Sequence, residues 1–428
     1  MGQRLFWSNG RRDTFTIDGA RVLDPVEGVD AALDVTVERG VITRLEPGSA
    51  REGLVLAPAF IDPHVHLRTP GREDEEDLVS GTAAAAAGGY CAILAMPNTE
   101  PVVDSAAVLG ALVERAEAEA QIPVGFLAAI TKGQQGRELT EMVELVERGA
   151  VGFTDDGRPV VSASLMRRAL QYNAASGGRI ALHEEDPALT RDGHMHEGAV
   201  SAELGLGGWP SVAESTMVGR DVALASFEGR GLHLLHLSAR GSVDELRRAR
   251  EAGLDATAEV TPHHLCLTDE AVRTLDPNLK MNPPLRSGDD RAALLDALRD
   301  GTIGAIATDH APHARHEKDA PFEEAPFGVT GLETAFAALN TALVEPGVVS
   351  LECVLERMSA GPAAIYGLER PRIAVGAPAN LVLLDVAAAV RVEESSFRSK
   401  SANSWLLGKT LRGRVLRTVA GGKVVHEA

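Results

Sequence analysis

Eight short apolar runs alternate with helical segments between about residue 53 and about residue 365, and this alternation constrains the fold more than any other feature. Near-continuous apolar runs are typical of strands that are buried on both faces of a parallel sheet. Eight successive strand-then-helix units predict a (β/α)8 barrel. The predicted strands are residues 54–68, 90–99, 122–131, 150–157, 179–186, 231–239, 254–264 and 302–312. Helix-period segments between them include residues 104–120, 162–175, 242–253 and 289–301.

The two ends of the chain have a different pattern. Residues 14–52 and 371–427 look like short antiparallel strands joined by turns, so we expect both ends to meet in one small β-sandwich beside the barrel. A chain of 428 residues is long enough for a barrel and such a module. The predicted division is residues 1–57 and 366–428 for the sandwich and residues 58–365 for the barrel.

Charge and cysteine content exclude several classes of function. A formal net charge of −19 disfavours binding to nucleic acid or to anionic membranes, and it means that a site for an anionic substrate must supply its own positive charge. Three cysteines with no C-x-x-C pair indicate a reducing compartment. We see neither a signal peptide nor an apolar run long enough to cross a membrane, so we expect a soluble, cytoplasmic protein.

Polar residues able to bind a metal or a substrate follow seven of the eight apolar runs, where each predicted strand ends. The C-terminal strand ends of such a barrel form one rim, and active sites lie there. Residues far apart in the sequence should therefore converge. These residues are His64, His66, Arg68, Asn98, Asp155, Asp156, His183, His236, His263, His264, Asp309, His310 and His313.

The spacing in the first strand indicates a metal site. Residues two apart in a strand point to the same face, so His64, His66 and Arg68 are all expected to face the barrel mouth. Zn²⁺ favours imidazole and carboxylate ligands. Only one of the adjacent Asp155 and Asp156 should point inward. Four histidines and two aspartates fit a pair of metal ions about 3.5–4 Å apart, and this set is His64, His66, Asp156, His183, His236 and Asp309.

A series of motifs resembles the long-chain dihydroorotases of the amidohydrolase superfamily, in the same order and through the whole predicted barrel. Thr69 is one departure, because the family pattern HVHLREPG has glutamate there. The motifs are DPHVHLRTPG (62–71), MPNTEP (96–101), FTDDG (153–157), HEED (183–186), TPHHL (261–265), MNPPLR (281–286), ATDHAPH (307–313), FGVTGLE (327–333) and PANLVLLD (378–385).

The resemblance implies ring closure of N-carbamoyl-L-aspartate to L-dihydroorotate in pyrimidine synthesis, with two Zn²⁺ ions per subunit, and a homodimer. It places Asp156 between the ions, with His64, His66 and Asp309 on one and His183 and His236 on the other. Asp309 is the expected proton carrier. The guanidinium of Arg68 suits the substrate carboxylate. The implied substrate-binding residues are His66, Arg68, Asn98, Asn282, His313, Phe327 and Gly328.

Two other functions compete with this interpretation. An allantoinase or a hydantoinase/dihydropyrimidinase would act on a similar cyclic ureide, but Arg68 and the Asp156 bridge favour dihydroorotase. A catalytically inactive scaffold for aspartate transcarbamoylase would be expected to lack metal ligands, and all six are present here. Residues 313–328 are long, polar and proline-rich, and we predict that they form a lid over the barrel mouth.

Overall fold

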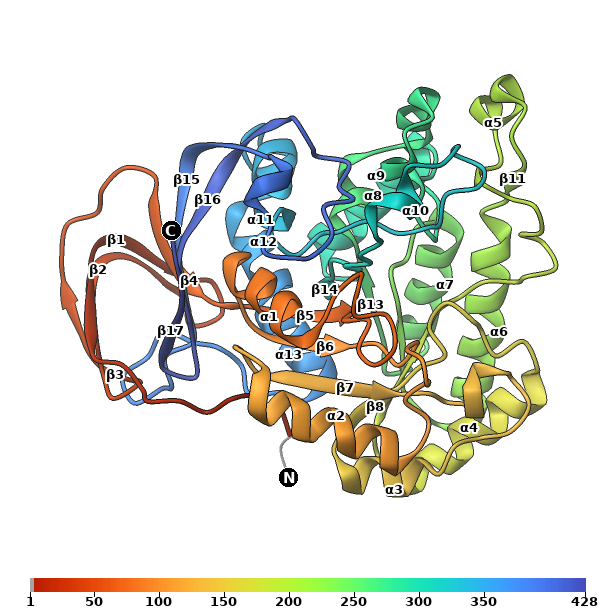
Figure 1. Ribbon diagram of the computed structural model, residues 1–428, viewed down its shortest axis with the longest axis horizontal. Coiled ribbons are helices and arrows are strands. Elements are labelled where there is room, and N and C mark those ends of the chain that lie inside the picture. Colours follow the sequence, from red (N-terminus) through yellow and green to blue (C-terminus); the bar gives the residue numbers. More distant parts are fainter. Residues whose placement is uncertain (1–3) are drawn as a thin grey trace.

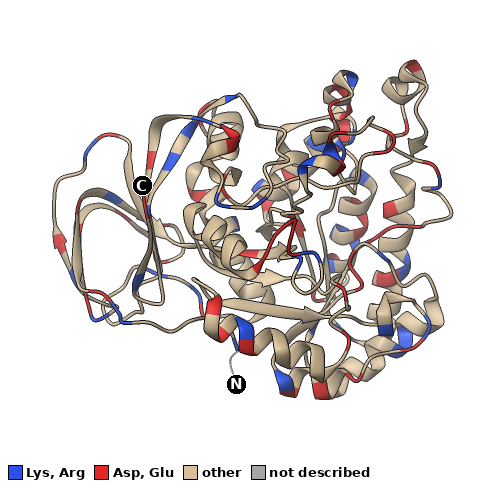
Figure 2. Cartoon of the chain, viewed as in Figure 1, with Lys and Arg blue, Asp and Glu red and all other residues tan. Residues whose placement is uncertain are grey.

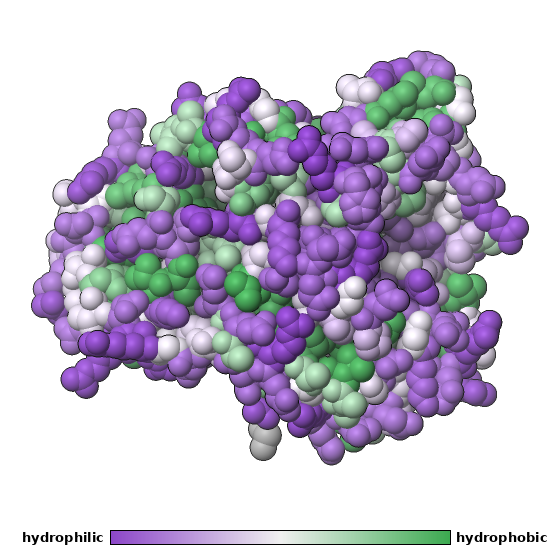
Figure 3. Space-filling view, viewed as in Figure 1, coloured by the Kyte–Doolittle hydropathy of each residue, from purple (hydrophilic) through white to green (hydrophobic). Residues whose placement is uncertain are grey.

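The computed structural model describes residues 4–428, so the first three residues of the predicted 1–57 segment lie outside the described residues. An eight-stranded sheet surrounded by helices lies beside a seven-stranded sheet that contains both ends of the chain (Figure 1). Lys, Arg, Asp and Glu are scattered over the outer helices and loops (Figure 2). Hydrophilic side chains cover most of the face seen in Figure 3, with small apolar areas between them. Among residues 4–428, no helix has the length and apolar character needed to cross a membrane.

The eight-stranded sheet is a parallel barrel, as predicted. Its hydrogen-bonded order is β14-β13-β12-β9-β8-β7-β6-β5. A parallel bridge between Val65 and His310, with a 2.9 Å hydrogen bond from His66 N to His310 O, joins the two outer strands and closes the barrel. The strands are β5 (Phe60–Val65), β6 (Tyr90–Ala95), β7 (Val124–Ala128), β8 (Ala150–Phe153), β9 (Arg179–Leu182), β12 (Leu232–Leu234), β13 (Ala256–Val260) and β14 (Ala305–Ile306).

Each barrel strand is followed by one or more helices, which completes eight β/α units. Cap residues set the bounds of several of these helices. The Ser162 side chain accepts a hydrogen bond from Leu165 N at the start of α4, and Gly177 ends that helix with a φ of 75°, in the left-handed region that glycine adopts freely. The outer helices are α1 (Leu78–Ala87), α2 (Ala106–Glu119), α3 (Met142–Arg148), α4 (Ala163–Ser176), α6 (Val212–Glu228), α7 (Arg240–Glu251), α9 (Gly288–Asp300), α12 (Leu351–Met358) and α13 (Ala360–Tyr366).

Smaller elements lie in the loops at the barrel mouth and between the barrel and the second sheet. The two-residue strands β10 and β11 pair in parallel, and α5 follows β10 in the chain. α10 belongs to the segment predicted as a lid. These elements are β10 (Met195–His196), α5 (Ala199–Leu204), β11 (Gly208–Trp209), α8 (Pro262–Cys266), α10 (Arg315–Lys318) and α11 (Ala335–Leu339), with short helical turns at 132–134, 269–274, 277–279, 340–344 and 394–396.

Both ends of the chain form the second sheet together, in the order β17-β16-β15-β4-β1-β2-β3. Its pairs are antiparallel except β1 with β4, which is parallel. Apolar residues from both chain ends, including Val22, Val35, Leu381 and Val419, share one core cluster. The strands are β1 (Phe15–Asp24), β2 (Val29–Glu38), β3 (Val41–Pro47), β4 (Leu54–Pro58), β15 (Leu381–Arg391), β16 (Thr410–Ala420) and β17 (Lys423–Glu427).

The apolar run 54–68 is not one barrel strand, and this part of the prediction was wrong. Its first half is β4, which pairs with β1 and β15 in the second sheet, and its second half is β5, which pairs with β6 in the barrel. The hydrogen-bond partner changes at one point, because Ala59 N donates to Asn380 O at 3.0 Å and Phe60 N donates to Gly89 O at 3.0 Å. Both halves are buried, so hydrophobicity alone does not reveal the change of sheet.

Candidate metal centre and substrate pocket

The C-terminal ends of the barrel strands surround a cavity of about 180 Å³. It brings together residues from most of the barrel units, as the position of the strand ends predicted. His64 lies beneath this cavity with its side chain fully buried. The residues lining the cavity are His66, Arg68, Asn98, Asp156, Gly157, His183, His236, Asn282, Asp309, Ala311, His313, Phe327 and Gly328.

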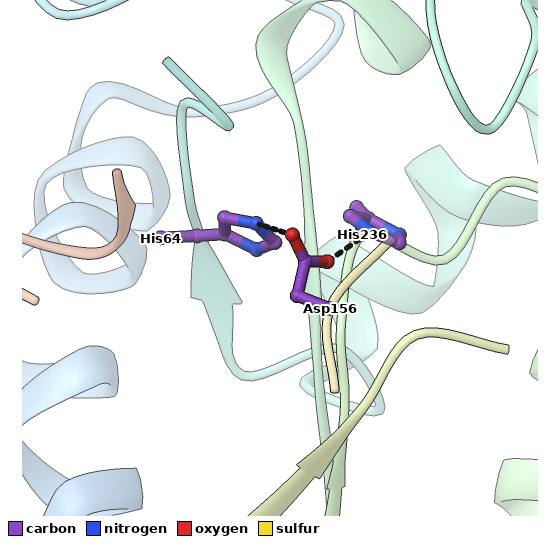
Figure 4. A group of neighbouring side chains, drawn as sticks. All are labelled: His64, Asp156 and His236. Carbon is purple, nitrogen blue, oxygen red and sulfur yellow. Dashed lines mark ion pairs between the residues drawn. The ribbon is translucent and has the colours of Figure 1, made fainter. Parts of the chain in front are cut away.

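The carboxylate of Asp156 lies between two groups of imidazoles. Its Oδ2 is 3.6 Å from His64 Nε2 and 3.5 Å from His66 Nε2. Its Oδ1 is 3.6 Å from His183 Nδ1 and 3.5 Å from His236 Nε2. Figure 4 shows this arrangement for His64 and His236, each of which faces a different carboxylate oxygen. The geometry is that of a carboxylate able to bridge two ions.

Asp309 completes the first group. Its Oδ1 lies 3.4 Å from His64 Nε2 and 3.2 Å from His66 Nε2, and these three residues offer donor atoms within 4.8 Å of one another. His64, Asp156 and His236 form a second such group. His183 adjoins the second group through a 3.0 Å contact between its Nδ1 and His236 Nε2.

The adjacent aspartates have separate roles. Asp155 turns away from the centre, where its carboxylate accepts hydrogen bonds from Ile130 N at 2.8 Å and Thr131 N at 3.1 Å. Burial raises the pKa of Asp155 to about 6, although these hydrogen bonds oppose the rise. Asp156 is therefore the inward residue, and Asp155 holds the loop that follows β7.

The residues present fit a pair of metal ions. Two ligand atoms bound at about 2.0–2.1 Å to one tetrahedral ion lie about 3.4 Å apart, and the nitrogen–oxygen distances of 3.2–3.6 Å match that separation. Within residues 4–428, His64 Nε2 and Asp156 Oδ1 are buried and have no hydrogen-bond partner. Buried polar atoms rarely lack partners, and ligation would satisfy both.

The carboxylates and imidazoles of the centre stabilise one another's charged forms. Burial alone would raise the pKa of Asp156, but the neighbouring charge of His64 and the close approach of the His183 and His236 rings lower it well below its usual range. Burial alone would lower the pKa of His183, yet Asp156 and Glu185 raise it to about 10. The pKa of His64 is also raised, because Asp156 and Asp309 outweigh its burial. These shifts favour an ionised Asp156 and protonated rings at His64 and His183, and a metal ion would displace the ring protons.

A second layer of carboxyl and amide groups orients the imidazoles. His64 Nδ1 lies 2.8 Å from Glu259 Oε1, and His66 Nδ1 lies 2.8 Å from Asn98 Oδ1. A proton on each Nδ1 leaves Nε2 free as a metal ligand, which is the usual arrangement of such histidines. Glu259 also contacts His233 Nε2 at 3.1 Å. Our sequence analysis missed Glu259, although a lone glutamate inside the strand ATAEV is a signal for a buried polar partner.

Two metal-site residues have strained backbones. His236 has a φ of 30° and Asp309 a φ of 49°, in the left-handed region that residues with a Cβ rarely adopt. Such strain is found most often where a side chain must be aimed at a functional centre. Both residues follow the end of a barrel strand, so the strain lies where each chain segment leaves the barrel.

Arg68 lines the cavity, but not for the predicted reason. β5 ends at Val65, and Arg68 has a φ of 56°, so strand alternation does not set its direction. Its Nε donates to Pro312 O at 3.1 Å and lies 3.0 Å from Glu75 Oε2. Both of these contacts use Nε, and among the described residues no hydrogen bond uses the two terminal nitrogens.

The remaining predicted substrate-binding residues also line the cavity. Asn282 Nδ2 donates to Glu185 Oε2 at 3.3 Å. His313 Nε2 lies 2.8 Å from Phe327 O, and Gly328 follows with a φ of 123°. A Cβ at Gly328 would lie 2.7 Å from Ala311 Cβ and 3.1 Å from His313 Nε2, so only glycine fits at this point of the wall.

Comparisons with known proteins show the family of this chain. A family model described as dihydro-orotase-like matches residues 53–242. A dihydroorotase of Geobacter metallireducens is 46% identical over 420 residues, which cover 96% of this chain and 99% of that protein. A dihydroorotase of Anaeromyxobacter dehalogenans is 46% identical over 97% of this chain and 98% of its own length. The chain belongs to the dihydroorotase family.

Solved structures with a similar fold come from a related group. The L-hydantoinase (dihydropyrimidinase) from Arthrobacter aurescens has a TM-score of 0.85 at 24% identity and covers 96% of both chains. A dihydropyrimidinase from Brevibacillus agri has a TM-score of 0.82 at 21% identity, over 97% of this chain and 95% of that one. Likeness at this identity establishes the barrel and its accompanying sheet, whereas the sequence relatives establish the dihydroorotase family.

The departure from the dihydroorotase pattern at Thr69 has a clear place in the structure. Thr69 is 3% exposed, and its Oγ1 is buried without a hydrogen-bond partner among the described residues. No ligand of the metal centre is affected. The carboxylate beside Arg68 belongs to Glu75, a residue that was not predicted from the sequence.

Proposed function

We propose that this chain catalyses the dihydroorotase reaction, the reversible closure of N-carbamoyl-L-aspartate to L-dihydroorotate, which is the third step of pyrimidine synthesis. The observation that carries the proposal is the convergence of six metal-type ligands and Arg68 around one cavity. Relatives that are 46% identical over nearly the whole chain support it.

We further propose that the centre binds two Zn²⁺ ions. His64, His66 and Asp309 would hold one ion, His183 and His236 the other, and Asp156 would bridge them. Bound there, the ions would supply a nucleophile that is deprotonated near neutral pH and would polarise the amide carbonyl.

Asp309 is the proposed proton carrier. Burial alone would raise the pKa of its carboxyl, but the charges of His64, His66 and His236 lower it below the usual range, so it enters the reaction ionised. In the hydrolytic direction it accepts the proton of the attacking water and delivers it to the ring nitrogen that leaves. In ring closure it removes the proton from the ureide nitrogen that attacks the carboxyl carbon, and it returns that proton to the oxygen, which leaves as water when the C–O bond breaks.

Substrate binding would use the other side of the cavity. The terminal nitrogens of Arg68 would form paired, charge-assisted hydrogen bonds with a substrate carboxylate. Asn282 and His313 also line this side, and their polar atoms would orient the ureide and the carboxylate edges. The guanidinium of Arg68 would also supply the local positive charge that an anionic substrate needs in a chain with a net charge of −19.

An absorbance assay of L-dihydroorotate hydrolysis, with and without a chelator, tests the proposal. We expect turnover in the metal-replete protein, loss of turnover after chelation and recovery after addition of Zn²⁺. Metal analysis should find about two equivalents per chain. Less than one equivalent after metal-replete purification, together with no turnover, would favour the inactive scaffold. Faster hydrolysis of hydantoin or allantoin than of dihydroorotate would favour the related cyclic ureide hydrolases.

The cytoplasmic location, the homodimer and an association with aspartate transcarbamoylase rest on the sequence and on the family resemblance alone, and they stay predictions. The lid also stays a prediction. In the segment 313–328, Lys318 Nζ donates to Pro277 O at 3.0 Å and to Pro326 O at 2.7 Å, which fixes α10 to the loop after α8.

A further inference from the structure

A buried carboxylate outside the metal centre lies against the substrate side of the cavity. Glu75 follows β5 by ten residues, belongs to no strand or α-helix, and has a fully buried side chain. Its Oε2 is 3.0 Å from Arg68 Nε, and its Oε1 is 2.7 Å from Arg72 Nη2 and 3.2 Å from His313 Nδ1. One carboxylate therefore contacts two residues that line the cavity and one arginine nearer the surface.

The next residue shows that this placement is specific. Glu76 is also fully buried, but it faces the opposite way, where it contacts His310 Nε2 at 3.2 Å and the hydroxyls of Ser80 and Ser399. Glu76 therefore ties the loop to the barrel and to the segment before β16. Glu75 alone points to the substrate side.

The geometry around Glu75 also resembles a cation site, since Glu75, His313 and Glu317 offer donor atoms within 4.8 Å of one another. Two arginines, Arg68 and Arg72, already supply positive charge to this cluster. Arg72 Nη2 lies 2.5 Å from Glu317 Oε1 and 2.7 Å from Glu75 Oε1. Two guanidinium groups beside these carboxylates would repel a metal ion, so the cluster is better explained as an anchor for the arginines.

We propose that Glu75 is a positioning residue, which holds the Arg68 guanidinium and the His313 ring in the orientation that binds the substrate carboxylate. This inference rests on the proposed function and deepens it. A buried guanidinium is costly unless an opposite charge and hydrogen bonds compensate it. Nε donates its hydrogen to the carbonyl of Pro312 and forms an ion pair with Glu75, so the two terminal nitrogens remain to bind the substrate carboxylate as an end-on fork.

The same contact explains how the chain functions without the glutamate expected at residue 69. A carboxylate there would be adjacent in sequence to Arg68, whereas Thr69 supplies a buried hydroxyl and no charge. Glu75 reaches the guanidinium from the far side of the loop. Because Glu75 also contacts His313, it links the loop after β5 with the segment after β14. This link fixes the positions of the two sides of the substrate pocket relative to each other.

Glu75→Gln is the direct test, because it removes the charge and preserves the size of the side chain. We expect the KM for L-dihydroorotate and for N-carbamoyl-L-aspartate to rise by on the order of 10-fold, with kcat within about threefold and the Zn²⁺ content unchanged. Asp74→Asn is the matched control, since it removes an exposed carboxylate from the same loop, and its kinetics should equal those of the parent chain. Equal KM values for Glu75→Gln and the parent chain would overturn the proposal.

A double-mutant cycle separates positioning from general stability. In an Arg68→Met background, Glu75→Gln should raise KM by clearly less than it does in the parent chain, because, of its contacts with cavity residues, only that of Glu75 with His313 remains. An undiminished effect in that background would contradict action through Arg68. Glu75→Asp keeps the charge and should recover part of the KM. If Glu75→Gln is insoluble, this variant carries the test, and a KM equal to that of Glu75→Ala would reject the proposal.

The cycle also distinguishes two failures. A normal KM in the Arg68→Met protein would remove the basis of the proposed substrate, whatever Glu75 does. A raised KM in Arg68→Met together with a normal KM in Glu75→Gln would reject only the role of Glu75 and leave the proposed function intact.

Discussion

The two sides of the cavity are built in different ways. On the metal side, the imidazoles of His64 and His66 extend from β5 or the residue after it, and Glu259 in β13 and Asn98 after β6 orient them. On the substrate side, Arg68 and His313 lie on loops, and Glu75 and backbone carbonyl groups hold them. The geometry of the metal side depends on the closed sheet. The geometry of the substrate side depends on how the loop after β5 and the segment after β14 are positioned relative to each other.

This difference indicates which residues of the site can change without disturbing the barrel. Ligands that belong to strand ends cannot move without disturbing the sheet, so the metal side is tied to the fold. Loop residues can change with little effect on the barrel. The hydantoinase structures share the fold at 20–24% identity.

Asp309→Ala should produce the largest effect. Removing the proton carrier of the metal side is expected to lower kcat for dihydroorotate hydrolysis by at least about 10³-fold, which lies within the range of general acid–base catalysis. The far-ultraviolet circular dichroism spectrum should match that of the parent chain. Retention of more than a tenth of the parent kcat would show that Asp309 is dispensable and would contradict its role as the proton carrier of the metal side.

Arg68→Met tests the substrate side and should come next. A hydrogen bond to a charged group is worth about 1.5–3 kcal/mol, so we expect kcat/KM for dihydroorotate to fall by about 10- to 150-fold. Hydrolysis of an uncharged cyclic ureide, measured with the same protein, should fall much less. An equal loss with both substrates would mean that Arg68 supports the pocket as a whole rather than binding the carboxylate.

Glu259→Gln tests whether the second layer belongs to the metal side. The partners of metal-binding histidines contribute about 10- to 100-fold to metal affinity, so Zn²⁺ affinity, measured by competition with a chromophoric chelator, should fall within that range. The KM measured at saturating Zn²⁺ should change little. Asp255→Asn, at the exposed residue just before β13, is the control and should leave Zn²⁺ affinity unchanged.

Proton release on metal binding should be the smallest effect. The pKa of His183 is raised to about 10, and Asp156 and Asp309 also raise the pKa of His64, which favours protonated rings in the metal-free protein. Zn²⁺ binds the deprotonated ring, so loading should release about two protons per chain. Calorimetric titrations in two buffers with different ionisation enthalpies measure this number, and a value of zero would contradict the charge balance described for the metal side.

Much of the barrel and its metal centre could be predicted from the sequence. All eight apolar runs contain a barrel strand, and the six ligand residues converge because parallel strands end at the same rim. The change from β4 to β5 escaped prediction, because pairing partners leave no mark in a continuously buried run. The roles of Glu75 and Glu259 also escaped it, because each depends on partners that are distant in the sequence.

The position of β4 between β1 and β15 has a consequence for how the protein forms during synthesis. β4 leaves the ribosome early, but its antiparallel neighbour at residues 381–391 is made more than three hundred residues later. Until then β4 has an unpaired edge, and unpaired edges invite aggregation. The barrel strand that begins at Phe60 thus starts next to an incomplete sheet, and a nascent chain that stalls before β15 would be a natural client for chaperones.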